Sequence, residues 1–104
     1  MATTVIDDRS KSRYELLVDE VVVGFADYEL GADRIAVVHV EVDQDMGGHG
    51  LGRKLVDGVL DDVRRRGLFV LPRCPFTRKV IAEEQGSYLD LVPMDAREEF
   101  GLPR

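Results

Sequence analysis

Residues 47–52 read Gly-Gly-His-Gly-Leu-Gly, with four glycines in six positions, and this stretch decides the fold. It follows a strand-like run at 34–42 and precedes an amphipathic helical run that starts at Leu51. Glycines let the backbone turn tightly and approach a ligand closely, and the unpaired N–H groups at the start of a helix attract anions. The junction therefore predicts an anion-binding site.

Three antiparallel strands are predicted before the glycines. Residues 14–18 and 21–28 are separated by Asp19 and Glu20, which predicts a hairpin with a two-residue turn. After a further turn, residues 34–42 form the run richest in β-branched residues. Residues 1–12 are polar and lack periodicity, so we expect a flexible N-terminal arm.

The pattern changes to helical spacing after the glycines. One apolar stripe contains Leu51, Leu55, Val59 or Leu60, and Val63. Gly67 suits the end of this helix, and residues 68–71 are predicted as a buried strand. Because it follows a helical crossover, we expect that strand to run parallel to the strand at 34–42.

The rest of the chain is predicted to hold a second helix and a last strand. Pro75 opens the helix, which runs to about Gln85, and residues 88–92 are predicted as the strand. Residues 94–104 are read as a polar C-terminal tail. The sequence thus predicts one α/β domain at 13–93, with a mixed, mostly antiparallel sheet and two main helices.

Composition and charge exclude several classes of protein. The 104 residues suit a single domain, and no apolar run approaches the ~18 residues of a membrane span. A net charge of −6 opposes broad binding to nucleic acid or to anionic membranes. The start of the chain lacks the pattern of a secretory signal, and the single Cys74 forms no internal disulfide, which favours a cytoplasmic protein. No Cys/His spacing predicts a metal site, and the exposed sheet edges leave open a monomer or a weak dimer.

Two other interpretations of the glycine stretch are less consistent with its neighbours. A Walker A phosphate loop needs Lys and then Ser or Thr after the last glycine, but this chain has Arg53 and Lys54. A dinucleotide fingerprint that starts at Gly48 needs a third glycine at position 53, and it normally follows the first strand of a parallel sheet.

The order of elements, the spacing and the charge together resemble the GNAT superfamily of acetyl-CoA-dependent N-acetyltransferases. Its loop, Gln/Arg-x-x-Gly-x-Gly/Ala, binds the coenzyme A pyrophosphate through backbone N–H groups. Gly50 and Gly52 match this loop, whereas Gly47 stands where Gln or Arg is usual, and Arg53 is positioned to compensate. The resemblance is closer to the short single-domain branch and implies a truncated GNAT-like α/β fold. It also implies acetyl-CoA as cofactor, bound by Val40, Val42, Gly47, Gly48, His49, Gly50, Leu51, Gly52, Arg53, Phe76 and Lys79.

His39 and Glu41 are the first candidates for catalysis. Strand alternation predicts that they share one face with Ile35 and Val37. An imidazole and a carboxylate beside the thioester would accept the proton of an acceptor ammonium, directly or through water. The alternative is structural: a hydrogen-bonded strand histidine and a solvated charge at the strand end.

Cys74 and Tyr88 are the candidates for the other half of the reaction. Cys74 precedes Pro75 at the expected N-terminus of the second helix, where the dipole and Arg73 favour a thiolate. It would accept the acyl group or protonate the departing sulfur, or else be an inert buried thiol. Many superfamily members use a tyrosine as this acid; Phe76 stands at the aligned place, which leaves Tyr88 as the other candidate.

The resemblance therefore implies transfer of an acetyl group to a primary amine by direct attack on the thioester. The acceptor would be a small-molecule or peptide amine. Gly47 and Phe76 favour an alternative, a coenzyme A-binding regulatory or interaction module without catalysis. A nucleotide-binding phosphate loop is the third hypothesis.

Overall fold

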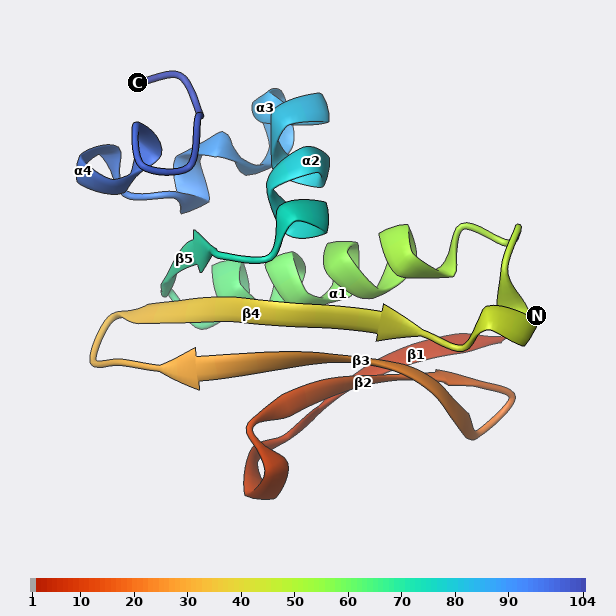
Figure 1. The fold of residues 1–104 in the computed structure, drawn as a ribbon. Coiled ribbons are helices and arrows are strands. Elements are labelled where there is room, and N and C mark those ends of the chain that lie inside the picture. Colours follow the sequence, from red (N-terminus) through yellow and green to blue (C-terminus); the bar gives the residue numbers. More distant parts are fainter. Residues whose placement is uncertain (1) are drawn as a thin grey trace.

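The computed structural model describes residues 2–104 as one five-stranded sheet with helices packed against one of its faces (Figure 1). The strand order is β1-β2-β3-β4-β5; the first four strands are antiparallel, and β5 is parallel to β4. The predicted mixed, mostly antiparallel sheet is therefore confirmed. The strands are β1 (Thr3–Asp8), β2 (Arg13–Val18), β3 (Val21–Leu30), β4 (Arg34–Val42) and β5 (Phe69–Pro72). The helices are α1 (Leu51–Arg65), α2 (Pro75–Glu83), α3 (Gln85–Tyr88) and α4 (Met94–Arg97), and three short 3₁₀ turns are η1 (Arg9–Lys11), η2 (Gln44–Met46) and η3 (Leu89–Leu91).

The predicted hairpin and the first helix are confirmed. Asp19 and Glu20 both have positive φ, at 49° and 72°, so they form the two-residue turn without a glycine. Helix α1 buries its apolar stripe against the sheet, including Leu55, Leu60 and Val63, each fully buried. Gly67 has φ 70°, the left-handed conformation that follows many helices.

The first residues of the chain form a strand instead of the expected flexible arm. Strand β1 pairs with all six residues of β2. Its Val5 packs into a notch on α1, because a β-carbon at Gly58 would lie only 2.6 Å from Cγ2 of Val5. The Tyr28 hydroxyl donates to Asp7 at 2.7 Å and fixes the end of the strand. The prediction of an arm from polarity and missing periodicity overlooked four consecutive β-branched residues at 3–6, which favour a strand.

A β-bulge changes which residues of β4 share a face. The register places Val37 opposite Tyr28 but His39 opposite Asp27, so Val38 has no partner of its own on β3. Val37 is buried beneath α1, whereas His39 is exposed on the other face. The prediction that His39 and Glu41 share a face with Ile35 and Val37 is therefore wrong.

The C-terminal part of the chain also differs from the prediction. Within the predicted strand at 88–92, Tyr88 ends α3, residues 89–91 form the turn η3 and Val92 is a bend, so this prediction is wrong. The expected polar tail contains α4, and it buries Phe100 and Leu102 in the core. The folded unit therefore extends beyond 13–93 in both directions. No helix within residues 2–104 has the length and apolar character needed to cross a membrane.

Candidate functional site

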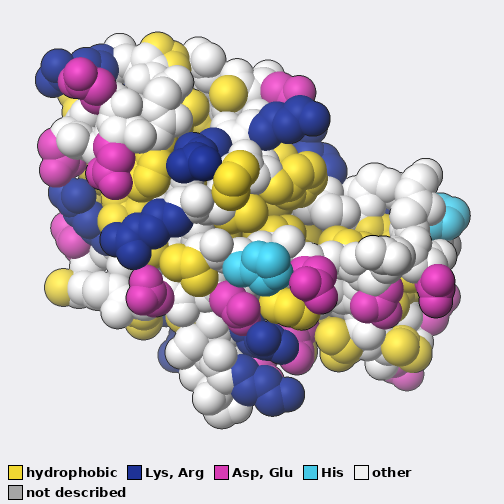
Figure 2. Space-filling view, viewed as in Figure 1, with side chains coloured by type: hydrophobic (Ala, Val, Ile, Leu, Met, Phe, Trp, Pro, Cys, Tyr) yellow, Lys and Arg dark blue, Asp and Glu magenta, His cyan; other side chains and the backbone are white. Residues whose placement is uncertain are grey.

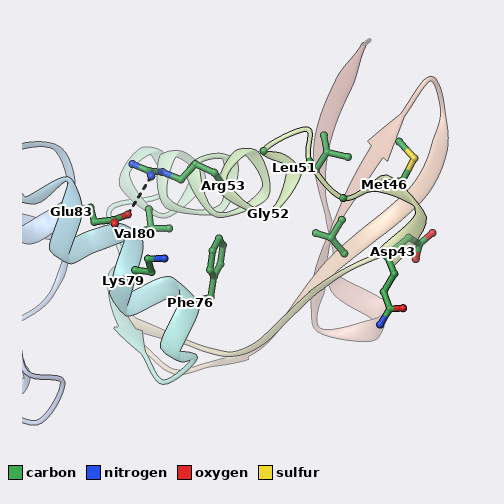
Figure 3. A pocket seen from close by; sticks show the side chains of 14 residues that line it. Asp43, Met46, Leu51, Gly52, Arg53, Phe76, Lys79, Val80 and Glu83 are labelled. Carbon is green, nitrogen blue, oxygen red and sulfur yellow. Dashed lines mark ion pairs between the residues drawn. The ribbon is translucent and has the colours of Figure 1, made fainter.

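The glycine loop forms one wall of a pocket of about 490 Å³ between the end of β4, the start of α1 and one side of α2 (Figure 3). The predicted cofactor residues in its lining are Val42, Gly47, Gly48, Gly50, Leu51, Gly52, Arg53, Phe76 and Lys79. Val40 and His49, also predicted, do not line it. The sequence interpretation missed Asp43, Gln44, Met46, Val80 and Glu83.

The start of α1 presents open backbone N–H groups to this pocket. Gly50 precedes the helix with φ 67°, and no side chain caps the helix. Lys54 is the first residue to pair within the turn, donating to the Gly50 carbonyl at 3.1 Å. The N–H groups of Leu51, Gly52 and Arg53 therefore lack intrahelical acceptors, and all three residues line the pocket. This is the geometry that binds phosphate at helix N-termini.

The absence of a side chain at Gly52 makes room for Phe76. A β-carbon on Gly52 would lie 3.3 Å from Cε2 and Cζ of the Phe76 ring. The ring stands on α2 and points toward the start of α1, closing one side of the pocket (Figure 3). Gly52 therefore serves a close approach between two helices.

Arg53 lies in the pocket wall, but its guanidinium is held by carboxylates. Nη2 donates to Oε1 of Glu84 at 2.9 Å, and Nη1 lies 3.6 Å from Oε1 of Glu83. Nε lies 3.7 Å from Asp57 and is buried without a hydrogen-bond partner. The arginine thus links α1 to α2 and points toward Glu83 in Figure 3. Lys54, its neighbour, is exposed and does not line the pocket.

The charges in the pocket lining are balanced. Arg53 and Lys79 are the cationic side chains, and Asp43 and Glu83 are the acidic ones. The residues that α2 contributes to the lining are Phe76, Lys79, Val80 and Glu83. These four positions repeat at helical spacing, so this side of α2 was a signal available in the sequence.

Strands β4 and β5 separate next to the pocket. Their pairing ends at Val37 opposite Pro72, and the Cys74 N–H then donates to the Val37 carbonyl at 3.0 Å. Beyond that point, within residues 2–104, no strand covers this edge of β4. On the other side of β4, the Asp43 N–H donates to the Val23 carbonyl of β3 at 2.7 Å. Because hydrogen-bonding residues alternate in antiparallel pairs, Val40 and Val42 direct their backbone polar groups to the open edge.

His39 and Glu41 lie together, but on the sheet face opposite α1. Nε2 of His39 lies 3.3 Å from Oε1 of Glu41, and both side chains are more than half exposed. The His39 ring lies 5.9 Å from that of Phe25, centroid to centroid. At the level of β4, Figure 2 shows acidic side chains and a histidine in a row, with Lys and Arg side chains above them. The pair is therefore accessible from solvent and outside the loop pocket.

Cys74 and Tyr88 are both buried and do not line the pocket. Cys74 occupies the N-cap position of α2, ahead of Pro75 at its first position, as predicted from the sequence, but its thiol makes no capping hydrogen bond. The Tyr88 hydroxyl donates to Asp57 at 2.7 Å, and burial together with this carboxylate raises its pKa. Cys74 lies where β4 and β5 separate, whereas the hydroxyl of Tyr88 is occupied by its hydrogen bond to Asp57.

Comparison with known proteins agrees with this geometry. Residues 13–91 match the family described as GCN5-related N-acetyltransferase. The comparison with curated proteins gave no significant match.

Three solved structures illustrate the similarity of the fold. A GCN5-like protein from Staphylococcus aureus is 21% identical, with a TM-score of 0.63 over 86% of this chain and 87% of that protein. Rv2747 from Mycobacterium tuberculosis, solved in complex with CoA and NLQ, is 23% identical, with a TM-score of 0.52 over 86% of this chain and 58% of that one. The ribosomal-protein-S18-alanine N-acetyltransferase from Escherichia coli is 25% identical, with a TM-score of 0.52 over 56% of this chain.

The chain spans only 38% of the length of that Escherichia coli enzyme. The match to the family nevertheless covers strands β2 to β5, the glycine loop and both main helices. The chain therefore belongs to the family of GCN5-related N-acetyltransferases.

Proposed function

We propose that this protein binds acetyl-CoA at the glycine loop and transfers its acetyl group to a primary amine. The observation that carries the proposal is the uncapped start of α1 beside an open edge of β4, both next to one pocket. Open helix N–H groups suit the pyrophosphate of coenzyme A. Membership in a family of N-acetyltransferases supports the acetyl group as the group that is transferred.

The open edge of β4 suits the rest of the cofactor. The pantetheine arm of coenzyme A contains amide groups, and amides pair with an unpaired strand edge as another strand would. Val40 and Val42 would supply the backbone partners, and Phe76 would cover the arm from α2. Val40 thus keeps its predicted role through its backbone, although its side chain does not line the pocket.

The chemical step divides between two faces of the sheet at the point where β4 and β5 separate. The neutral amine attacks the thioester carbonyl, the new C–N bond replaces the C–S bond, coenzyme A leaves as its thiolate, and the surplus proton on the new amide nitrogen passes to solvent. We assign His39 or Glu41, on the open face, to accept the ammonium proton directly or through water. We assign Cys74, beside the separation, to protonate the departing sulfur and to regain its proton from solvent, and we assign Tyr88 a structural role.

One feature supports the alternative of a coenzyme A-binding module without catalysis. Glu83 and Glu84 hold the guanidinium of Arg53, which leaves Lys79 as the other cation in the pocket lining. Such a site would bind its cofactor weakly, as suits a sensor or an interaction module. The two functions differ in whether any amine releases free thiol.

The test records amide shifts during titration with acetyl-CoA, coenzyme A and ATP. We expect the amide signals of Gly48 to Arg53 to shift with coenzyme A but not with ATP. No shift of these signals with coenzyme A would refute the site. Thiol release is then measured over a panel of amines for wild type and for His39→Ala, Glu41→Ala and Cys74→Ala. Binding without release from any amine would favour the non-catalytic module.

A further inference from the structure

A second hollow, of about 370 Å³, lies on the sheet face turned away from α1. Its floor includes Ala36 of β4 and Leu71 of β5, which are paired in register. Glu29, Arg34 and Arg73 provide its charged side chains. None of the residues assigned above to coenzyme binding or to catalysis lines this hollow.

The strand register connects the hollow to the proposed base. Ala36 pairs with Glu29, and His39 pairs with Asp27. Because Asp27 and Glu29 are two residues apart on β3, they share a face, and so do Ala36 and His39. Because of the bulge, the two pairs lie two β3 residues apart, which is about 7 Å along the strand. A ligand in the hollow would therefore lie on the open face, within reach of His39.

The charges in the hollow are opposite and loosely paired. Nη1 of Arg73 donates to Oε1 of Glu29 at 3.2 Å, and both side chains are more than half exposed. Arg34 lies 3.3 Å from Asp95, also at the surface. Such exposed ion pairs contribute little to stability and exchange readily for a ligand. A carboxylate and guanidinium groups together match a ligand that carries both an ammonium and a carboxylate.

We propose that the acceptor is a small diamino acid held by its zwitterionic head group in this hollow. Its α-carboxylate binds Arg73 and Arg34, its α-ammonium binds Glu29, and its aliphatic chain runs from Ala36 along β4. The distal amine then reaches His39 and receives the acetyl group. This inference rests on the proposed acetyl transfer and specifies its substrate class.

The activity test uses two acceptors that differ only in the carboxylate, L-lysine and 1,5-diaminopentane. We expect kcat/KM to be at least about 10-fold higher for lysine, with acetylation at the side-chain nitrogen. Arg73→Gln should lower kcat/KM for lysine and remove the preference for lysine over the diamine. Arg9→Gln, which removes an exposed arginine from the opposite edge of the sheet, is the control and should preserve the preference.

A binding test keeps the inference separate from the proposed function. Side-chain-acetylated lysine, which cannot react again, is titrated without coenzyme while amide shifts are recorded. Gly31 and Leu71 should move in wild type and stay still in Arg73→Gln. If these amides move although no amine is acetylated, the hollow is confirmed and the proposed function fails. Equal rates for lysine and the diamine, or no shift at Gly31 and Leu71, would overturn the inference.

Discussion

Gly52 of α1 and Phe76 of α2 pack so closely that a β-carbon on the glycine would lie 3.3 Å from two atoms of the ring. This contact is tighter than ordinary van der Waals packing, so any side chain at position 52 must displace the ring. Because both residues line the loop pocket, the contact sets the width of the pocket as well as the approach of the two helices.

Gly52→Ala should therefore weaken coenzyme A binding more than it changes stability. Alanine is favoured over glycine within a helix by about 1 kcal/mol, which offsets part of the cost of moving Phe76. We expect the Kd from calorimetry to rise about 10-fold, with a stability change below about 1 kcal/mol. In a Phe76→Ala background the same substitution should have almost no effect on binding; an equal loss there would contradict the explanation.

Gly50→Ala tests the backbone conformation ahead of α1. Gly50 has φ 67°, a region that costs other residues about 1–2 kcal/mol, although no atom would obstruct the new β-carbon. Chemical denaturation should show a loss of about 1 kcal/mol. Gly86→Ala, also unobstructed but without positive φ, is the control and should be neutral or stabilising.

The elements around these glycines were predictable because local patterns determine them. The apolar stripe of α1, the β-branched run of β4 and the position of Pro75 all appear in the structure where the sequence places them. The fold of the centre of the chain thus follows from periodicity and from glycine and proline chemistry.

The remaining features depend on contacts between distant residues. The bulge at Val38 moves His39 and Glu41 to the face opposite Val37, and no pattern within β4 reveals it. Strand β1 depends on Gly58 and Tyr28, far along the chain. Glu83 and Glu84 meet Arg53 only after α2 packs beside α1. For the site, the sequence therefore predicted the glycine loop at the start of α1 better than the charges around it.

Tyr88→Phe separates a structural tyrosine from a catalytic acid. The hydroxyl donates to Asp57 at 2.7 Å, and its pKa is raised, so it stays protonated and bonded at neutral pH. Removing it leaves Asp57 without this donor and should cost about 1 kcal/mol of unfolding free energy. The rate of thiol release should not change. A loss of kcat at full stability would instead make Tyr88 the acid.

Tyr28 makes stability sensitive to alkaline pH. Burial and the Asp7 carboxylate raise the pKa of Tyr28 from 10.0 to about 12 in the folded state. The folded state thus favours the protonated hydroxyl, so this stabilisation is complete below pH 10 and is lost as the pH rises toward 12. Unfolding measured from pH 9 to 12 should show a steeper decline for wild type than for Tyr28→Phe. Parallel curves would contradict a role for this hydroxyl.

Glu83→Gln should tighten coenzyme A binding. Its carboxylate lines the pocket and lies 3.6 Å from Arg53, so it repels a phosphate and competes for the same guanidinium. Removing an exposed charge of this kind changes affinity by about 1 kcal/mol, which is about fivefold in Kd. Glu84→Gln is the matched control: it makes the same change in charge and also contacts Arg53, at 2.9 Å, but it does not line the pocket. Calorimetry at low and at moderate salt should show a larger gain for Glu83→Gln, and the gain should shrink as salt screens the repulsion. Equal tightening by both substitutions would mean that the overall charge of α2, rather than the carboxylate inside the pocket, limits cofactor binding.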